Sequence, residues 1–291
     1  MKKLTEMKLP MKILLIFCLI AILAFSSSAA VCFFGLKVTN YEVTLKGVAS
    51  PFRALLISDL HSRQFGKDNA RLLEKIKEQR PDVIFADGDM ISRNSDEKDV
   101  EHFLVLLAEF KKIAPVYYAP GNHEQEYVGE STELYEKIEA LGVLVLNDSY
   151  VDVEIAGQPV RLGGTLGHGF MFGRTEEEFE TSPEYIFLSD FQNTDRPKIC
   201  LAHMPDTFIF NGAANLWDVD LVLSGHTHGG LIRLPFLGGL IAPMQGFFPE
   251  YDKGYFELGN NMQMIISAGL AGYGILPRIN NLPEICVIDI K

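Results

Sequence analysis

The residues that could do chemistry gather first in residues 225–230, a stretch that reads GHTHGG. The chain has seven histidines, and two of them, His226 and His228, stand here one residue apart between glycines. Imidazole nitrogens bind ions such as Mn²⁺, Fe²⁺ and Zn²⁺. On an extended chain the two side chains would share one ion, whereas a turn would direct them to two neighbouring ions. The stretch therefore predicts a metal site and leaves the number of ions open.

Four other short motifs place polar side chains directly after apolar runs. They are DLH, DGD, GNHE and LAH, which contribute Asp59, His61, Asp87, Asp89, Asn122, His123, Glu124 and His203. Any one of these residues alone is typical of a turn or a cap. The same arrangement after five apolar runs favours one shared site, because α/β proteins build their sites at the carboxyl ends of strands.

The side-chain types in these motifs indicate which ions the site would accept. Asp59 and His61 are one residue apart, so on an extended chain both can reach the same ion. Carboxylate, imidazole and amide-oxygen ligands suit Mn²⁺, Fe or Zn²⁺. Mg²⁺ prefers oxygen ligands and retains its waters, so the number of histidines makes it a less favoured ion.

Alternating strand-like and helix-like segments position these motifs. Apolar strand-like runs lie in residues 53–61, 82–89, 114–124, 197–203 and 219–228, and helical spacing lies in 68–80, 98–112 and 133–142. This alternation predicts an α/β sheet with helices outside it. From about Val151 onward, short strands separated by Gly and Pro predict a second, more antiparallel sheet packed on the first.

The first 36 residues read differently from the rest. Lysines at positions 2, 3, 8 and 12 precede an apolar run from Ile13 to Phe25, and the chain stays uncharged to Leu36. This pattern is typical of a secretory signal peptide with a cleavage site at residues 28–30, but it is also long enough to span a bilayer. We expect an uncleaved single-pass anchor; the alternatives are a cleaved and secreted form or a buried core helix. The lysines favour a cytoplasmic N-terminus and a main domain outside the cytoplasm.

Composition excludes some classes of partner. With 47% hydrophobic and 22% charged residues, the chain is typical of a globular protein with a sizeable core. Its net charge of −12 disfavours nucleic-acid backbone binding, which selects a basic face. Cys200 and Cys286 lie in strand-like runs without thiol metal spacing, so buried apolar cysteines are expected ahead of a disulfide. Nothing in the sequence predicts an oligomeric state.

The ordered set DLH, GD, GNHE, H and GHTHGG resembles the calcineurin-like metallophosphoesterases, and the resemblance covers the region from Arg53 to the C-terminus. The segments GHTHGGLIRLPFLGG and LPRINNLPEI are similar to the bacterial membrane-associated branch. That branch includes phosphodiesterases and UDP-diacylglucosamine pyrophosphatases of lipid A synthesis. Leu231 departs from the branch, which often shows Gln at this position. The resemblance implies a four-layer α/β/β/α sandwich.

The resemblance also implies a role for each motif residue. A first divalent ion would be held by Asp59, His61 and His228, and a second by Asn122, His203 and His226, with Asp89 bridging both. His123 would bind no metal. It would face the substrate phosphate and the leaving-group oxygen as the catalytic acid or charge stabiliser.

The expected function follows from these roles and from the N-terminal segment. Residues 37–291 would form a catalytic domain that hydrolyses a phosphoester through a hydroxide bridging two metal ions. A tethered enzyme meets lipid-linked substrates at high local concentration, so a phosphodiester or pyrophosphate of a lipid or cell-envelope substrate is expected ahead of a soluble nucleotide. The alternative is a non-catalytic metal-binding, membrane-tethered protein of the same fold.

Some residues outside the metal set carry weaker predictions. Glu124 is expected in an exposed turn, with the alternative that it orients a neighbouring histidine or a ligand. Three further residues are expected at the surface: His102 on a solvated helix face, His168 in a loop rather than lining the substrate pocket, and Arg278 in an ion pair rather than against a phosphate. The aromatic segments 169–180 and 245–256 are expected to pack as ordinary loops, the alternative being an apolar rim or a membrane contact.

Overall fold

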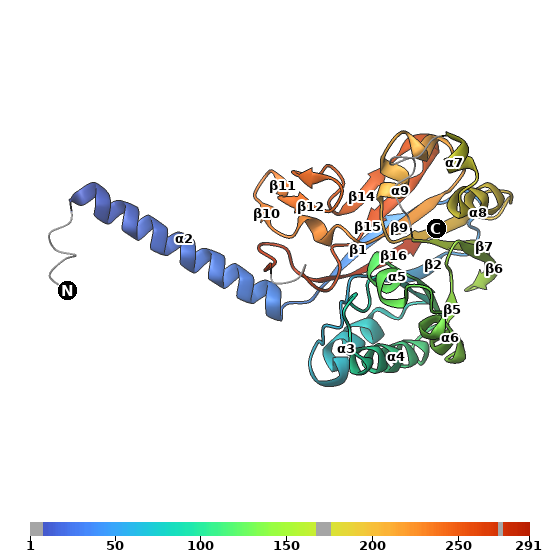
Figure 1. Ribbon diagram of the computed structural model, residues 1–291, viewed down its shortest axis with the longest axis horizontal. Helices are drawn as coiled ribbons and strands as arrows, with labels where there is room; N and C mark the ends of the chain where they lie inside the picture. The colour runs from blue at the N-terminus through green and yellow to red at the C-terminus, as the bar shows by residue number, and fades with distance from the viewer. Residues whose placement is uncertain (1–7, 167–175, 273–275) are drawn as a thin grey trace.

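The computed structural model describes residues 8–166, 176–272 and 276–291. These residues form two six-stranded sheets packed face to face, with helices on both outer faces and one long helix that leaves the domain (Figure 1). His168 and most of the aromatic segment 169–180 lie outside the described residues.

The first sheet carries the N-terminal motifs. Its strand order is β1 (Lys37–Val43), β16 (Glu284–Ile290), β2 (Phe52–Ile57), β3 (Val83–Asp87), β4 (Val116–Ala119) and β5 (Leu144–Val145). Strands β2 to β5 are parallel, and β1 is parallel to β16, but β16 runs antiparallel to β2. Every residue of β3 is buried, as expected of a parallel strand covered on both faces.

The second sheet carries the C-terminal motifs. Its strand order is β14 (Gly254–Glu257), β15 (Gln263–Ile266), β9 (Leu221–Ser224), β8 (Lys198–Ala202), β7 (Gln158–Thr165) and β6 (Ser149–Ile155). The four central strands are parallel, and antiparallel pairs form only at the two edges. The sheet is mixed, with an antiparallel pair at each edge, whereas the first sheet has one such pair, and helical crossovers keep β7, β8 and β9 parallel.

Three buried clusters separate four layers. Side chains from both sheets, such as Phe85 and Leu223, fill the space between them. On the outer face of the first sheet lie α3 (Ala70–Gln79), α4 (Glu97–Lys111) and α6 (Glu133–Ala140). On the second lie α7 (Glu176–Glu180), α8 (Pro183–Phe191) and α9 (Asp206–Ile209). The expected α/β/β/α sandwich is confirmed.

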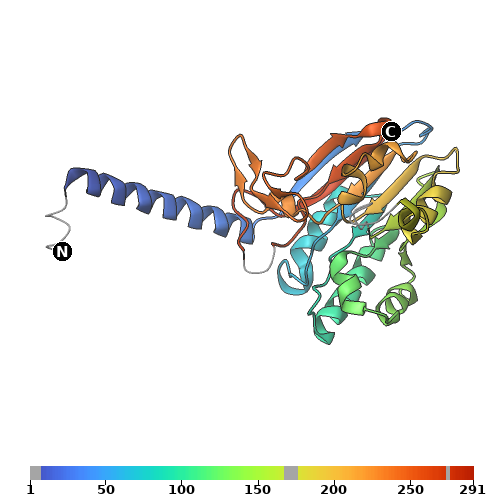
Figure 2. The ribbon, with the colours of Figure 1, turned by 45° about the horizontal axis from the view of Figure 1, so that its top comes forward.

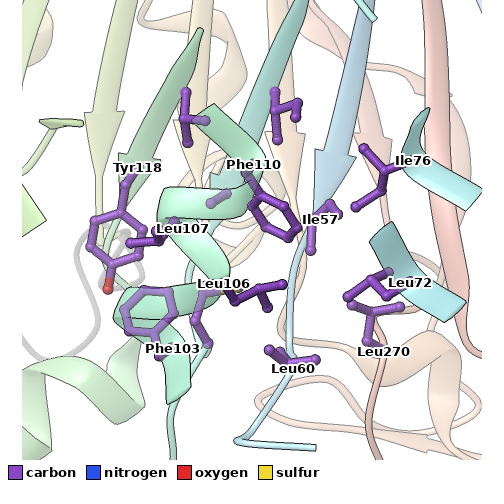
Figure 3. Close-up of a cluster of buried hydrophobic side chains, with 14 of the residues drawn as sticks. Ile57, Leu60, Leu72, Ile76, Phe103, Leu106, Leu107, Phe110, Tyr118 and Leu270 are labelled. Carbon is purple, nitrogen blue, oxygen red and sulfur yellow. The ribbon is translucent and has the colours of Figure 1, made fainter. Parts of the chain in front are cut away.

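The α4 helix illustrates how the sequence sets these layers. Asp96 caps its first turn by accepting a hydrogen bond from Asp99 N at 2.9 Å. Its apolar stripe then turns inward, and Figure 3 shows Phe103, Leu107 and Phe110 pointing toward the strands of the first sheet. Cys200 and Cys286 are buried and unpaired in β8 and β16, as expected. Four short 3-10 helices complete the described connections: η1 (Lys67–Asn69), η2 (Ala213–Asn215), η3 (His228–Gly230) and η4 (Gly259–Asn261).

The long N-terminal helix α2 (Leu9–Phe34) is apolar and exposed. It has 26 residues, and its most apolar window has a mean hydropathy of 2.6 with no residue buried. Its length and composition suit a membrane span or a signal sequence, and its exposure excludes a buried core helix. Its last turn contacts the domain: Arg63 and Arg71 donate to the carbonyl oxygens of Phe33 and Phe34, and Cys32 is buried.

Two small hairpins follow the GHTHGG motif. One pairs β10 (Arg233–Leu234) with β11 (Gly238–Gly239), and the other pairs β12 (Ile241–Ala242) with β13 (Gly246–Phe247). Both lie outside the two large sheets, at the end of the domain from which α2 extends (Figures 1 and 2).

Candidate metal centre

The five motifs meet where the central parallel strands of both sheets end. Asp59 follows β2, and Asp89 follows β3. Three further motif residues begin or follow elements at the same edge: Asn122 opens α5 (Asn122–Val128) after β4, His203 follows β8, and His226 follows β9. Because the two sheets face each other, five loops that are distant in sequence converge on one place.

Glycine lets two of these loops approach closely. Gly88 has a φ of +67°, and a Cβ added there would lie 2.4 Å from His203 Nδ1. A Cβ on Gly225 would lie 2.5 Å from Asp59 Oδ2. Side chains at these two positions would separate the loops that the centre needs in contact.

Five of the seven predicted ligands have left-handed backbones. Their φ angles are 51° for Asp59, 45° for His61, 53° for Asp89, 66° for His226 and 49° for His228. A non-glycine residue pays roughly 1–2 kcal/mol for this conformation. Such strain persists where the surrounding structure over-determines the backbone, and it concentrates at functional sites.

The ligand-type atoms form three overlapping groups. Within each group, all ligand atoms lie within 4.8 Å of one another; the groups are Asp59–His61–His228, His61–Asp89–His123 and Asp89–His203–His226. Asp89 Oδ2 stands 3.6 Å from His61 Nε2 and 3.3 Å from His203 Nε2. One carboxylate therefore lies between the two sides of the cluster.

Buried polar atoms without partners point to a bound cation. Among the described residues, five such atoms belong to the predicted ligand set: Asp59 Oδ2, His61 Nε2, Asn122 Oδ1, His203 Nε2 and His226 Nε2. Leaving a buried polar atom unpaired costs about 1–3 kcal/mol. Divalent cations would satisfy all five, so the residues present fit the ions that the sequence predicts.

Charge at the centre is balanced between imidazoles and carboxylates. Burial lowers the pKa of His61, His226 and His228 to about 3, so their rings are neutral and can offer a lone pair. Burial also opposes charge on His203, but the carboxylates of Asp89 and Asp59 outweigh it and raise the pKa of His203 well above its ordinary value. In the metal-free protein His203 therefore carries the proton that a cation would displace.

Backbone carbonyls fix the orientation of two rings. His203 Nδ1 lies 2.9 Å from Asp87 O, and His228 Nδ1 lies 3.2 Å from Ala271 O. Each contact turns the Nε2 atom of the ring toward the cluster. Hydrogen bonds of this kind select the tautomer and raise the basicity of a metal-binding histidine.

Glu124 is buried, which contradicts the expectation of an exposed turn. Its carboxylate accepts hydrogen bonds from the backbone N–H groups of Asp89, Met90, Ile91 and Gly121, at 2.6 to 3.0 Å. Burial, together with the charge of Asp89, raises its pKa to about 7. Four donors around one carboxylate hold the loop that carries Asp89 against the start of α5.

His123 stands at the edge of the cluster beside Arg93. Its Nδ1 faces Arg93 N at 3.2 Å, and its Nε2 faces Arg93 Nη2 at 3.2 Å. A neutral imidazole can accept from only one of these two donors, so the tautomer decides which contact is a hydrogen bond. His123 Nε2 also lies 3.9 Å from Asp89 Oδ2. Arg93 was not singled out from the sequence, where its only signal is its place four residues after the GD motif.

A cavity of about 950 Å³ opens from His61 and His123 toward the end of α2. Its walls include Arg63, Arg93 and the apolar residues Phe33 and Phe34. The predicted polar residues thus share the cavity with the last turn of the N-terminal helix.

Arg278 also lines this cavity, but it is 4% exposed, so the surface ion pair is a wrong prediction. Its guanidinium donates to Ala271 O at 2.5 Å, Ala268 O at 2.7 Å and Asn281 O at 2.9 Å. His102, on α4, hydrogen-bonds Gln64 and belongs to none of the ligand groups among the described residues. Leu231 is buried directly after η3, and its carbonyl oxygen accepts a hydrogen bond from Asn281 Nδ2 at 3.2 Å.

Several known proteins are similar to this chain in sequence. A protein named as an uncharacterized metallophosphoesterase in Campylobacter jejuni is 28% identical over 261 residues, 88% of this chain and 63% of that protein. One of Aquifex aeolicus is 29% identical, covering 88% of this chain and 92% of the relative. Phosphodiesterase YaeI of Escherichia coli is 26% identical over 250 residues, 84% of each chain. The chain spans less than two thirds of the Campylobacter relative and of two from Helicobacter pylori.

The model of the family described as calcineurin-like phosphoesterase matches residues 52–230. This range is more than half of the chain and contains every motif from Asp59 to His228. The chain belongs to the calcineurin-like phosphoesterases, the metal-dependent hydrolases of phosphoesters.

Proposed function

We propose that this chain is a membrane-anchored hydrolase with two divalent metal ions that cuts a phosphodiester or pyrophosphate in a lipid or cell-envelope substrate. One observation carries the proposal. Asp89 Oδ2 lies 3.6 Å from His61 Nε2 and 3.3 Å from His203 Nε2, and this cluster opens into a cavity walled by the end of α2.

The ligand groups support a division into two ion sites. The first ion would be held by Asp59, His61 and His228, the second by Asn122, His203 and His226, and Asp89 would contact both. The residue types suit Mn²⁺, Fe or Zn²⁺ better than Mg²⁺. When bound, such a pair of ions supplies a water of lowered pKa as the nucleophile and offsets phosphate charge.

His123 and Arg93 would act on the substrate itself. In the tautomer whose Nδ1 accepts from Arg93 N, the Nε2–H of His123 and the Arg93 guanidinium, 3.2 Å away, are both donors. A phosphate oxygen between them would accept from both. As the ester bond breaks, His123 is placed to give its proton to the departing oxygen.

The walls of the cavity favour an amphiphilic substrate. Its polar part is formed by His61, His123 and Arg93, whereas Phe33 and Phe34 add an apolar surface and are each 66% exposed. An amphiphile would place its phosphate at the polar part and its acyl chains along α2. The Escherichia coli relative, named a phosphodiesterase, supports a diester ahead of a monoester.

We propose residues 1–36 as the anchor and 37–291 as the catalytic domain. Strand β1 begins at Lys37, immediately after the helix, and Cys32 and Leu36 are buried against the domain. Cleavage after residue 30 would sever the helix within its contact with the domain. Lys8 and Lys12, at the outer end of α2, favour an N-terminus in the cytoplasm and a domain outside it. An envelope phospholipid or wall polymer is then the expected substrate; a domain inside would favour a lipid-linked sugar nucleotide.

The test uses the full chain in detergent, stripped with chelator and reloaded with Mn²⁺, Fe²⁺, Zn²⁺ or Mg²⁺. Bis(p-nitrophenyl) phosphate, p-nitrophenyl phosphate and phospholipid micelles serve as substrates. Hydrolysis of the diester should require metal and should be lost in Asp89→Asn but retained in the matched control His102→Asn. A chain that binds metal but hydrolyses none of these substrates would favour the non-catalytic metal-binding alternative.

A further inference from the structure

The two hairpins after the GHTHGG motif expose a cluster of large apolar side chains. We call them the hairpin tips; their exposed fractions are 106% for Phe236, 65% for Leu237, 52% for Met244, 71% for Phe247 and 55% for Phe248. Residues 234–248 include no Asp, Glu, Lys or Arg, although 22% of the chain is charged. The expectation of ordinary loop packing is wrong for this part of segment 245–256.

Exposed apolar residues elsewhere in the described domain are dispersed. Val105 lies on α4, Leu144 on β5, Ile186 on α8 and Leu216 after η2. Isolated residues of this kind are normal on a protein surface. A group of five within residues 236–248, three of them phenylalanines, is typical of an interaction surface.

The backbone holds three of the tips in conformations that bulky residues avoid. Phe236, Met244 and Phe248 have φ angles of 68°, 58° and 55°. Hairpin turns that need positive φ ordinarily use Gly, Asn or Asp. The turns themselves therefore give no reason for large apolar side chains at these positions.

The base of the first hairpin and the turn of the second are bonded to the segment that precedes β14. Asp252 Oδ2 accepts from Arg233 Nη1 at 2.7 Å and from Gly239 N at 2.6 Å. Gln245 donates to Tyr251 O at 2.9 Å and accepts from Tyr251 N at 3.0 Å. These bonds join both hairpins to the segment that leads into β14, so the tips are held outward.

The hairpins lie beside the C-terminal part of α2. Both ribbon views place them there, at the end of the domain that α2 leaves (Figures 1 and 2). Asn280 links the two elements: its backbone N–H donates to Ser28 Oγ at 2.8 Å, and its Nδ2 donates to Arg233 O at 3.3 Å. A bilayer that received α2 would meet the hairpin tips at its surface.

We infer that the hairpin tips insert into the lipid bilayer beside α2 and seat the catalytic domain on it. The inference rests on the proposed role of α2 as an anchor. Continuity with α2 and the lack of charge in residues 234–248 favour lipid over a protein partner. Phenylalanine, leucine and methionine side chains suit the acyl boundary of a leaflet. With two points of attachment, the domain keeps the cavity at the end of α2 facing the lipid, so a lipid substrate enters from the bilayer.

The test measures the depth of single labelled positions in the full chain. Cys18 is exposed and would be replaced by Ser, whereas Cys32, Cys200 and Cys286 are buried. A cysteine is introduced by Phe247→Cys and labelled with an environment-sensitive fluorophore. The matched control is Ile186→Cys, an exposed apolar position (60%) on α8, across the domain from α2. Both proteins are placed in vesicles of phosphatidylcholine and phosphatidylglycerol, with and without doxyl-labelled lipid.

The label at 247 should emit at shorter wavelength and be quenched by doxyl lipid, while the label at 186 responds only to aqueous iodide. Leu237→Cys, on the other hairpin, provides an independent second reading. Iodide quenching at both 247 and 237 without doxyl quenching would overturn the inference. Labels that become exposed to water when the protein is diluted with empty lipid would also overturn the inference. In that case a second copy of the chain, and not lipid, would cover the hairpin tips. If the protein did not float with the vesicles, the proposed role of α2 as an anchor would itself be refuted. None of these fluorescence measurements depends on catalytic turnover, so the result can be interpreted even if the chain is inactive.

Discussion

The carboxylate of Glu124 accepts a hydrogen bond from the backbone N–H of Asp89 at 2.7 Å. The same carboxylate binds the next two N–H groups of that loop, Met90 and Ile91. A residue at the start of α5 thereby sets the position of the one carboxylate that lies between the two halves of the cluster.

Replacing Glu124 by Gln should weaken metal binding while the fold is kept. The amide has one acceptor oxygen instead of two, and its NH₂ group would face backbone donors. We expect metal affinity to fall about 10- to 100-fold, as it does when groups that orient ligands are lost. Titration with a chelating indicator measures this, and Glu130→Gln, an exposed position in the loop after α5, is the matched control. Unchanged affinity would contradict the positioning role.

Asp89→Ala should be more damaging than the loss of any other single ligand. Asp89 stands within 3.6 Å of His61 and 3.3 Å of His203, so both proposed ions lose a ligand. Elemental analysis should give about two divalent ions per active wild-type chain, fewer in Asp59→Ala, and fewest in Asp89→Ala. A fully active chain with one ion or none would contradict the two-ion proposal.

His123→Ala should retain its metals but lose about 10²-fold or more in rate. The loss should be smaller for p-nitrophenolate, a leaving group that scarcely needs a proton, than for an alkoxide. The comparison requires kcat for both esters alongside metal content. An equal loss for both would indicate that His123 stabilises phosphate charge instead of donating a proton. Loss of metal would mean that His123 is itself a ligand.

Arg93→Gln should raise KM for a charged diester and lower kcat as well. The guanidinium points at the same place as His123 Nε2, and a lost charge-assisted hydrogen bond is worth roughly 1.5–3 kcal/mol, or about 10- to 100-fold. Arg93→Lys should restore part of this loss, because charge returns without the planar fork. Lys112→Gln removes an exposed cation directly after the end of α4; it controls for net charge and should behave as wild type. Equal kinetics for Arg93→Gln and wild type would exclude contact with the phosphate.

Metal binding should strengthen as pH rises. The carboxylates around His203 raise its pKa above the ordinary value despite its burial, so the metal-free protein holds a proton there that binding must release. In the metal-free protein this raised pKa stabilises the fold fully below the unfolded value of about 6.5, and the contribution is lost as pH rises through the folded pKa. Chelated protein should therefore lose thermal stability toward alkaline pH more steeply than loaded protein. Calorimetry over a pH series measures both. Parallel curves would contradict the protonation of His203.

The strand-end motifs were predictable because each depends on a local pattern, an apolar run followed by polar residues. Asp59, Asp89 and His203 needed only the rule that carboxyl ends of parallel strands meet. Glu124 and Arg278 were placed at the surface because charged side chains are seldom buried. What buries them is a set of backbone N–H and carbonyl groups from other loops, which no local pattern reveals. The same limit applies to Arg93, which belongs to the site only through its contact with His123, 30 residues away in the sequence.

The pairing of β16 between β1 and β2 has a consequence for how the protein is made. β1 and β2 leave the ribosome early, yet the strand that joins them comes only after the chain from Ile57 to Glu284 has been synthesised. At 5–20 residues per second this takes roughly 10 to 45 seconds. During that interval both strands present unpaired edges. Nascent chains therefore remain open during that interval, and chains that stop before β16 would be recognisable to proteases by those edges.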